Sequence, residues 1–487
     1  MNYLKTKTLG ELRKTSYVQK SIKDELRDNL IHNIKNKINV FDNIHGYEDS
    51  VIPELKQAIL SRHNINLLGL RGQAKTKIAR LLIRLLDEYI PYVKGSEIYD
   101  DPLAPISEFA KEKIKELGDK TSISWLHRSD RFAEKLATPD VTVADLIGDI
   151  DPIKAANLKL SYADDRVIHY GMIPRANRCI FVINELPDLQ ARIQVSLFNI
   201  LQEGDIQIRG FKLRLALDIQ FIFTANPEDY TNRGSIVTPL KDRIGSQILT
   251  HYPKDLEIAK KITSQEIKST ESQKTNIHIP ELARDLLEQI SFEARISEYV
   301  DEKSGVSARL SISALENLLS KAELRLLKNN EEKTCLRLAD FTGIIPAITG
   351  KIELVYEGEQ EGAEFVANQL IENAVKTLFV KLFPKIEKLK KENSVSPYDE
   401  LISWFFNETG FEILNDITDE KYQEKLMSIL PLNNLVKKYQ PNTLKKDLPF
   451  LKEFTLWGLV QFKKLTKVAY GNGIQIQDPY GNYIKNI

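Results

Sequence analysis

A glycine-containing octapeptide, Gly69-Leu-Arg-Gly-Gln-Ala-Lys-Thr76, directly follows the apolar run Ile65–Leu68. This order predicts a buried strand, a tight turn and a helix that begins near Lys75. Glycines let backbone N–H groups turn towards an anion, and a helix N-terminus adds partial positive charge. The segment is therefore typical of a phosphate-binding loop. We expect Lys75 to reach the outer phosphates and the Thr76 hydroxyl to reach a bound Mg²⁺.

The composition disfavours several classes of protein. A chain of 487 residues is too long for a single core, which predicts several domains. Its 68 basic residues balance 68 acidic ones, so no overall charge favours nucleic acid or an anionic membrane. The 2 cysteines cannot build a disulfide framework, and no uncharged apolar run is long enough to span a bilayer. We therefore expect a soluble cytoplasmic protein.

The pattern of apolar residues changes along the chain. Residues 1–45 are charged and predict a helical N-terminal extension. Continuous apolar runs alternate with helical patterns in residues 46–255, which predicts a parallel sheet covered by helices on both faces. Residues 256–350 predict a helical lid, and residues 351–487 a helical C-terminal domain of unassigned role. The turn-rich stretch at 470–483 predicts a hairpin or an ordered tail.

Two further buried strands are followed by polar residues. Cys179–Ile183 precedes Asn184 and Glu185, and Phe221–Thr224 is followed closely by Asn226. In nucleotide hydrolases such a strand ends in Asp-Glu, and the glutamate polarises the attacking water, which is the role expected of Glu185. Asn184 replaces the aspartate; its amide oxygen can hold a magnesium-bound water but adds no charge. Asn226 is expected to hydrogen-bond the γ-phosphate or the attacking water.

Arginines at two places are candidates for stabilising charge on a transferring phosphoryl group. Arg243 follows a short helical pattern and is expected to act in the site of a neighbouring subunit, with Arg233 as the alternative. Arg309 begins a helical pattern in the predicted lid and is expected to contact the nucleotide from there, with Arg295 as the competing assignment.

These motifs, in this order, resemble those of the AAA+ ATPases over roughly residues 46–350. Ala74 before the lysine looks like the MoxR branch, where alanine is usual. The segment 171–181 resembles the one that precedes the second motif in magnesium-chelatase ATPase subunits. The segment 203–214 looks like the β-hairpin before the third motif of the same clade. The clade's insertion in the second helix would lie within about Thr138–Gly171.

The resemblance implies an α/β fold: a P-loop NTPase αβα core with a parallel sheet, an all-α lid and a helical C-terminal domain. It implies ATP and Mg²⁺ as ligands, bound between the subunits of a homo-oligomeric, commonly hexameric, ring. A partner protein carrying a von Willebrand factor A domain is also implied. The implied nucleotide-binding residues are Gly69, Gly72, Gln73, Ala74, Lys75, Thr76, Lys77 and Arg309; the metal-binding residues are Thr76 and Asn184; the catalytic residues are Glu185, Asn226 and Arg243.

Three functions remain open from the sequence. The favoured one is a MoxR-like motor that hydrolyses ATP to remodel a partner protein or complex. A magnesium-chelatase motor subunit, which serves metal insertion by a separate partner, has the same core motifs. A nucleotide-binding scaffold that hydrolyses slowly is the third, because Asn184 lacks the negative charge expected beside the metal.

Overall fold

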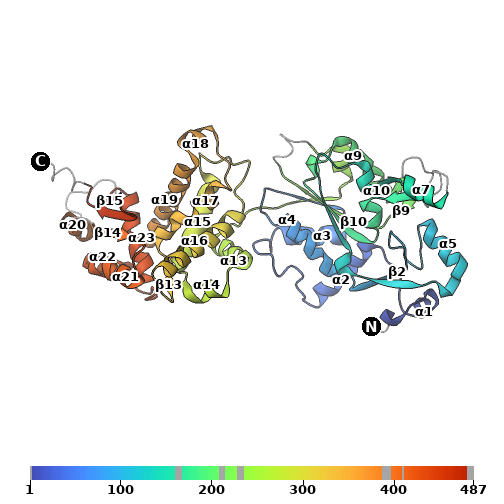
Figure 1. Ribbon diagram of the computed structural model, residues 1–487, viewed down its shortest axis with the longest axis horizontal. Coiled ribbons are helices and arrows are strands. Elements are labelled where there is room, and N and C mark those ends of the chain that lie inside the picture. The colour runs from blue at the N-terminus through green and yellow to red at the C-terminus, as the bar shows by residue number, and fades with distance from the viewer. Residues whose placement is uncertain are drawn as a thin grey trace. The chain divides into compact units, whose positions relative to one another are not determined.

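The computed structural model describes residues 3–159, 167–207, 214–227, 235–386, 396–407 and 411–479. Contacts along the chain divide it into two compact units, Met1–His251 and Tyr252–Ile487, which we describe separately (Figure 1). The first unit contains the phosphate-loop sequence and the second contains the segments predicted as lid and C-terminal domain.

The first unit is built on a parallel sheet of five strands in the order β11-β1-β10-β7-β4. The strands are β1 (Ile65–Leu68), β4 (Phe132–Leu136), β7 (Cys179–Asn184), β10 (Ile219–Ala225) and β11 (Ser246–Leu249). The three central strands are the continuous apolar runs of the sequence, and β7 and β10 are buried along their whole length. This sheet confirms the predicted α/β fold.

Alternate residues of the central strands enter two hydrophobic clusters, one on each face of the sheet. Phe181 and Phe221 join one cluster with residues of α9 and α10. Ile180 and Ile222 join the other with residues of α2, α3 and α4. In Figure 1 these two sets of helices lie on opposite sides of β10.

The helices of the first unit are α1 (Leu9–Arg13), α2 (Ile22–Lys35), α3 (Val51–Leu60), α4 (Lys75–Leu81), α5 (Glu108–Leu117), α6 (Val143–Leu146), α7 (Pro152–Leu158), α8 (Met172–Arg175), α9 (Ala191–Ser196), α10 (Phe198–Glu203) and α12 (Thr238–Arg243), with short 3₁₀ turns η1 (Tyr3–Lys5), η2 (Leu82–Leu85), η3 (Gly118–Lys120), η4 (Arg128–Asp130) and η6 (Leu186–Asp188).

Three antiparallel strand pairs accompany the sheet. They are β2 (Tyr89–Val93) with β3 (Ile123–His127), β5 (Gly148–Ile150) with β6 (Ile168–Tyr170), and β8 (Asp205–Gln207) with β9 (Arg214–Ala216). The β8–β9 pair confirms the hairpin expected in 203–214, whose tip at 208–213 lies outside the described residues. The predicted insertion, Thr138–Gly171, contains α6, β5, α7 and β6.

The second unit is mainly helical, as expected, and one hydrophobic cluster runs through it from Ile277 to Ile476. The helices predicted as a lid therefore share a core with those after Gly350, and the division of the unit at that glycine stays a prediction. Its elements are α13 (Leu256–Glu266), α14 (Glu271–Asn276), β12 (Ile277–His278), α15 (Glu281–Ile296), α16 (Arg309–Lys328), β13 (Thr334–Cys335), η7 (Leu338–Ile344), α17 (Ile345–Thr349), α18 (Tyr356–Glu361), α19 (Ala363–Leu382), α20 (Asp399–Asn407), β14 (Phe411–Leu414), α21 (Asp419–Ser428), α22 (Leu430–Tyr439), α23 (Leu448–Gln461), β15 (Thr466–Tyr470) and β16 (Gly473–Gln477).

Strands also occur in the second unit. The predicted C-terminal hairpin is present as β15 and β16, which are antiparallel and turn between Tyr470 and Gly473. The sequence interpretation did not predict β14, which pairs with β16 and makes a sheet in the order β14-β16-β15. Phe411 and Ile413 of β14 are buried while their neighbours are half-buried, which is the alternation of a sheet with one covered face.

Candidate functional site

The order of the strands brings three polar chain segments to one edge of the sheet. β10 lies between β1 and β7, with Leu68 opposite Ala225 and Phe223 opposite Ile183. All three strands are parallel, so the segments that follow them leave the sheet at the same end. Gly69, Asn226 and Glu185 begin or belong to those segments. In open α/β sheets, ligands bind in the crevice at the carboxyl ends of the strands.

The phosphate-loop sequence is anchored to its surroundings at both ends. A Cβ atom at Gly69 would overlap the Thr250 hydroxyl and the Gln73 amide oxygen, so a larger residue there would displace both side chains. The Thr250 hydroxyl donates a hydrogen bond of 2.7 Å to Gln73 Oε1. The Tyr47 hydroxyl lies 3.0 Å from the Gln73 carbonyl oxygen and donates to it. Tyr47 and Thr250 thus hold the loop, and no sequence motif marks either residue.

Two residues of the loop have left-handed backbone conformations: Gly72 with φ 74° and Ala74 with φ 57°. Glycine adopts this conformation freely, whereas for alanine it costs about 1–2 kcal/mol. Ala74 therefore carries local strain at the residue that caps α4. The strained turn directs the chain from the loop into the helix that begins at Lys75.

The ammonium group of Lys75 is 7% exposed and donates hydrogen bonds to the carbonyl oxygens of Gly69 and Leu70. A positive charge is thereby held against the loop, where a phosphate group would meet it. Thr76 and Lys77 are the next residues of α4, and both are half-buried.

The ends of β7 and β10 are joined by side-chain hydrogen bonds. The Thr224 hydroxyl donates to Asn184 Oδ1 at 3.2 Å and accepts from the backbone N–H of Glu185 at 3.1 Å. Glu185 has a left-handed backbone, with φ 53° and ψ 52°. Asn226 is 2% exposed, and its Oδ1 has no hydrogen-bond partner among the described residues. A buried amide oxygen of this kind marks a place where a polar group from a ligand or water fits.

A carboxylate that the sequence interpretation missed lies beside Asn184. Glu134 of β4 accepts a 2.6 Å hydrogen bond from Asn184 Nδ2 through Oε1. Its other oxygen accepts from Arg80 of α4, with Nη2 at 2.9 Å and Nε at 3.3 Å. β4 is half-buried and amphipathic, so it lacked the continuous apolar run that predicted β7 and β10. The structure thus adds one negative charge next to the neutral residue of the second motif.

The arginine candidates occupy different environments. Arg243 ends α12, donates to Gln202 and to the Pro239 carbonyl, and lies 5.0 Å from the centre of the Phe198 ring. Its alternative, Arg233, lies outside the described residues. Both arginines that compete for the lid role belong to the second unit, so this choice stays a prediction.

Arg309 begins α16 and is exposed. Arg295 is largely enclosed, with its guanidinium 4.4 Å from the centre of the Tyr252 ring and 5.1 Å from that of Phe292. Burial lowers the pKa of Arg295, against the attraction of Tyr252 and Glu288. The two arginines therefore differ in how readily a ligand phosphate could approach them.

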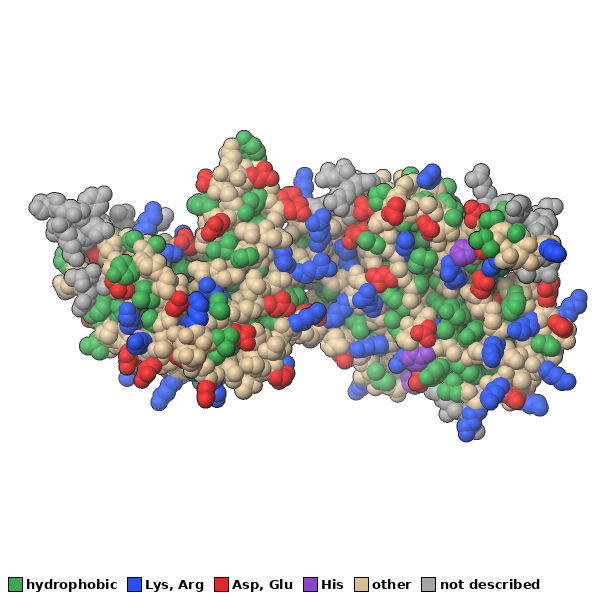
Figure 2. All heavy atoms as spheres, viewed as in Figure 1, with side chains coloured by type: hydrophobic (Ala, Val, Ile, Leu, Met, Phe, Trp, Pro, Cys, Tyr) green, Lys and Arg blue, Asp and Glu red, His purple; other side chains and the backbone are tan. Residues whose placement is uncertain are grey.

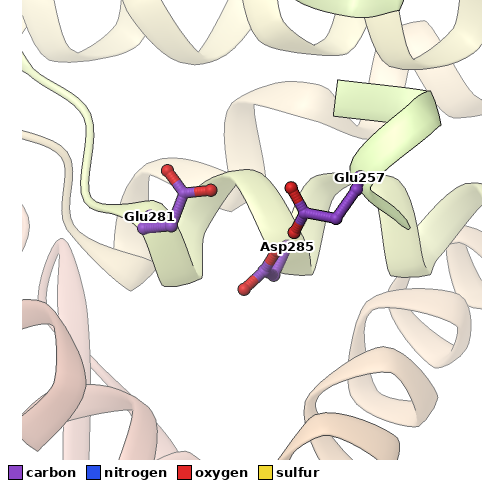
Figure 3. A group of neighbouring side chains, drawn as sticks. All are labelled: Glu257, Glu281 and Asp285. Atoms are coloured by element: carbon purple, nitrogen blue, oxygen red, sulfur yellow. The ribbon is translucent and has the colours of Figure 1, made fainter. Parts of the chain in front are cut away.

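An acidic group in the second unit has the ligand types of a cation site but already surrounds a lysine ammonium. Glu257 of α13 and Glu281 and Asp285 of α15 point towards one another (Figure 3). The ammonium of Lys260 lies 2.7, 2.5 and 2.7 Å from their respective oxygens. Desolvation would lower the pKa of Lys260, but the hydrogen bonds to the three carboxylates together raise it. The group is an ion-pair cluster that ties α13 to α15.

The residues of the strand edge fit Mg-ATP. The enclosed ammonium of Lys75 offers donors suited to phosphate groups, and the buried Oδ1 of Asn226 offers an acceptor to a water molecule beside them. Thr76, Asn184 and Glu134 offer oxygen atoms, which Mg²⁺ prefers as ligands directly or through its waters. Cys179 and Cys335 are free thiols, and burial raises the pKa of each to about 12, so neither is a reactive nucleophile.

Two surface observations accompany the site. Basic and acidic side chains are interspersed over the face shown in Figure 2, in line with the equal numbers of the two signs in the sequence. Among the described residues, none of the helices combines the length and the apolar character that crossing a membrane requires.

Comparisons with known proteins identify relatives by structure only. No family model matches the sequence, and no curated protein matches it significantly. The chain is similar to a candidate ATPase from Cytophaga hutchinsonii, with 17% identity over 73% of this chain and 95% of that one, and a TM-score of 0.30. The chain is also similar to the complex of magnesium-chelatase subunits BchI and BchD, with 18% identity over 65% of this chain and 97% of that one, and a TM-score of 0.34. Its similarity to Hsp104 with ATPγS and casein has 13% identity over 68% of this chain and 52% of that one, and a TM-score of 0.37. The assignment of the core as a P-loop NTPase fold rests on its strand order and its loop.

Proposed function

We propose that this protein binds Mg-ATP at the carboxyl edge of the parallel sheet and hydrolyses it, as a MoxR-like AAA+ motor that remodels a partner protein or complex. The observation that carries the proposal is the convergence of three segments far apart in the sequence. The Lys75 loop, the Glu185 segment and the Asn226 segment follow three adjacent parallel strands. A phosphate-binding loop beside a carboxylate and a buried amide is the arrangement that phosphoryl transfer to water requires.

The chain's own residues divide the chemistry between them. The loop amides and Lys75 would hold the β and γ phosphates, and Thr76 and Asn184 would hold the metal. When bound, Mg²⁺ neutralises negative charge on the phosphate oxygens. Glu185 would orient and polarise the attacking water, and Asn226 would hold that water or the γ-phosphate. Thr224 keeps Asn184 and Glu185 in fixed relation, because its hydroxyl is bonded to both.

Assembly into a ring is part of the proposal. Arg243 would be offered to the nucleotide of the next subunit, as the sequence resemblance implies. The guanidinium lies at an exposed end of α12, where another subunit can reach it. A hexamer and a partner with a von Willebrand factor A domain are implied by the resemblance to the MoxR branch, and a cytoplasmic location is implied by the composition. Association with a metal-inserting subunit would instead make the chain a magnesium-chelatase motor.

A slowly hydrolysing scaffold is the second candidate, and one observation favours it. Asn184 is uncharged, and its amide nitrogen is already committed to Glu134. If Glu134 does not supply the missing charge, the metal would be held less tightly and turnover would fall while nucleotide still binds.

The test compares ATP binding, ATP turnover and assembly in the full-length protein. Wild type is expected to bind a fluorescent ATP analogue, to hydrolyse ATP and to assemble with nucleotide, as followed by light scattering. Lys75→Ala should lose binding, because it removes the ammonium that is held on the loop carbonyls. Glu185→Gln should bind and assemble but lose about 100-fold or more in turnover, since it removes the charge that polarises water.

A matched control is Lys111→Ala, which removes an exposed lysine paired only locally with Glu108 of the same helix. It should match wild type in all three measurements. Equal inactivity of wild type and Glu185→Gln, with nucleotide bound by both, would establish the scaffold and reject the motor. Absence of binding by wild type would reject the site itself.

A further inference from the structure

Asn184 and Glu134 form a neighbouring pair that the motif pattern does not contain. The second motif of a nucleotide hydrolase usually has an aspartate where this chain has Asn184. In the structure, a carboxylate from another strand lies 2.6 Å from that asparagine's amide nitrogen. Leu136 is opposite Asn184 in the β4–β7 ladder, so Glu134 projects from the same face of the sheet two residues earlier.

We propose that Glu134 is a positioning residue for the bound Mg²⁺: it fixes the Asn184 amide and supplies, from the neighbouring strand, the negative charge that an aspartate would carry at position 184. This inference rests on the proposed function and names a residue of its metal site. Carboxylates that act on a metal through another group commonly set its affinity as strongly as the direct ligands do.

The hydrogen bonds fix the orientation of the amide. Asn184 Nδ2 donates to Glu134, and Asn184 Oδ1 accepts from the Thr224 hydroxyl. An anionic acceptor cannot accept from an amide oxygen, so Glu134 keeps the amide from flipping. The oxygen therefore stays on the side of Thr224 and the strand ends. Its second lone pair is the one available to a metal-bound water.

The charge of Glu134 is retained at the site despite Arg80. The Arg80 side chain is 63% exposed, whereas that of Glu134 is 25% exposed. Ion pairs with so exposed a partner contribute little free energy, because water screens them and holding the long side chain in place costs entropy. Arg80 also lies one helical turn after Thr76 on α4, so the pair ties the carboxylate to the helix that bears the metal-binding hydroxyl.

The pair explains why asparagine suits position 184. Two carboxylates within hydrogen-bond distance of each other would repel strongly and would offer no donor between them. An amide next to a carboxylate avoids this repulsion and donates a hydrogen bond to it. We therefore expect an aspartate at position 184 to be tolerated only when position 134 carries no charge.

The experiment is a double-mutant cycle on the full-length protein. The variants are Glu134→Gln, Asn184→Asp and the combination N184D/E134Q, with Glu112→Gln as a control that removes one exposed carboxylate from α5. The readouts are the Mg²⁺ concentration that half-saturates binding of a fluorescent ATP analogue, the same dependence of turnover, and the thermal unfolding midpoint.

We expect Glu134→Gln to raise the half-saturating Mg²⁺ concentration about 10-fold, with kcat at saturating Mg²⁺ changed less. Asn184→Asp alone should lower the unfolding midpoint, because it places a second carboxylate within hydrogen-bond distance of Glu134. The combination should restore the wild-type midpoint and the wild-type Mg²⁺ dependence. Glu112→Gln should leave all three readouts unchanged.

Two results would overturn the inference while leaving the proposed function intact. The first is an unchanged Mg²⁺ dependence in Glu134→Gln, with wild type and variant both binding ATP. The second is additivity, in which the changes that Glu134→Gln and Asn184→Asp each make to the Mg²⁺ dependence and to the unfolding midpoint sum to those of the combination. Failure of wild type to bind Mg-ATP would instead reject the proposed function and this inference together, and Lys75→Ala would then equal wild type.

Discussion

Two polar networks, one in each unit, are both built from arginines and carboxylates but differ in how they are enclosed. In the first unit, Arg80, Glu134, Asn184 and Thr224 form a chain of hydrogen bonds that ends in an arginine 63% exposed. In the second unit, the side chains of Arg325 and Arg337 are 3% and 1% exposed. The exposed arginine leaves the first network open to new partners, and we call it the open network. The buried arginines of the second network keep their partners, and we call it the enclosed network.

The enclosed network satisfies each charge several times. Asp419 accepts from Arg325 at 3.1 Å, from Arg337 at 2.5 Å and from Thr334 at 3.1 Å through one oxygen, and from the Cys335 backbone at 3.1 Å through the other. Asp340 pairs with Arg325 at 2.8 Å. These bonds join α16, η7 and α21, so the network fixes helices in place. The open network, in contrast, follows the ends of parallel strands, where ligands bind.

The largest effect should come from breaking the enclosed network. Asp419→Ala would leave Arg325 and Arg337 buried with reduced compensation, which should destabilise the second unit by about 3–5 kcal/mol. Denaturant unfolding followed by tryptophan fluorescence measures this, because Trp404 and Trp457 both belong to that unit. Asp416→Ala is the matched control: its pair with Lys328 is long, at 3.7 Å, and exposed. Equal losses from the two variants would contradict the contrast.

Breaking the open network should change chemistry more than stability. Thr224→Val keeps the shape of the side chain but removes the hydroxyl bonded to Asn184 and Glu185. Turnover of ATP should fall about 10- to 100-fold, or ~1.4–2.7 kcal/mol in activation free energy, with little change in KM. Thr455→Val, which removes a hydroxyl bonded to the Leu451 carbonyl within α23, should leave turnover unaltered. A larger loss of turnover in the control would reject the assignment.

Another carboxylate, Asp218, is half-buried and has weaker compensation than either network provides. It accepts from the Ile22 backbone, and burial raises its pKa to about 6, against the attraction of Arg178 and Arg131 and with repulsion from Glu25. The folded protein therefore holds this proton more tightly than the unfolded chain, whose group has a pKa of 3.8. Stability should then fall as the pH rises from about 4 through 6.

Asp218→Asn removes this pH-dependent cost and keeps an oxygen that can accept from Ile22. The difference between the two pKa values corresponds to about 3 kcal/mol at most, and we expect a gain of about 2 kcal/mol at pH 7.5. The gain should vanish near pH 4, where both proteins are neutral at this position. Unfolding free energies measured across that pH range test the sign, and a gain that is constant with pH would contradict it.

The sequence predicted the parts of the site that lie on continuous apolar strands. β1, β7 and β10 are buried on both faces, so their composition is visible in a short window, and the loop after β1 has a fixed spacing. Glu134 was missed because β4 is amphipathic and because its partner Asn184 lies 50 residues later in the chain. Asp419 and Arg325 are 94 residues apart and carry no motif. Side-chain pairs set by tertiary packing leave no local periodicity to detect.

The backbone conformation of the site residues could not be predicted from the sequence either. The sequence marked Ala74 as an unusual residue in the loop, but only the structure shows it at φ 57° and ψ 17°, in the left-handed region. Glu185 shares that conformation at the end of β7. Both strained residues therefore lie in the segments expected to contact nucleotide, whereas the enclosed network of the second unit contains no left-handed residue among those described. Strain of this kind is concentrated at functional sites.

The smallest effect should come from relaxing that strain. Ala74→Gly removes the left-handed cost of about 1–2 kcal/mol but adds flexibility to the unfolded chain, which offsets about 0.4–1 kcal/mol of it. We expect the first unit to gain about 0.5–1 kcal/mol in unfolding free energy. ATP affinity should change less than threefold, because the loop keeps its anchors at Gln73 and its ammonium at Lys75. Ala79→Gly is the control, since Ala79 lies inside α4 and is buried, where glycine should instead destabilise by about 1 kcal/mol. Destabilisation by both substitutions would show that the Ala74 backbone is not strained. The open network of the first unit would then differ from the enclosed network of the second only in the exposure of its side chains.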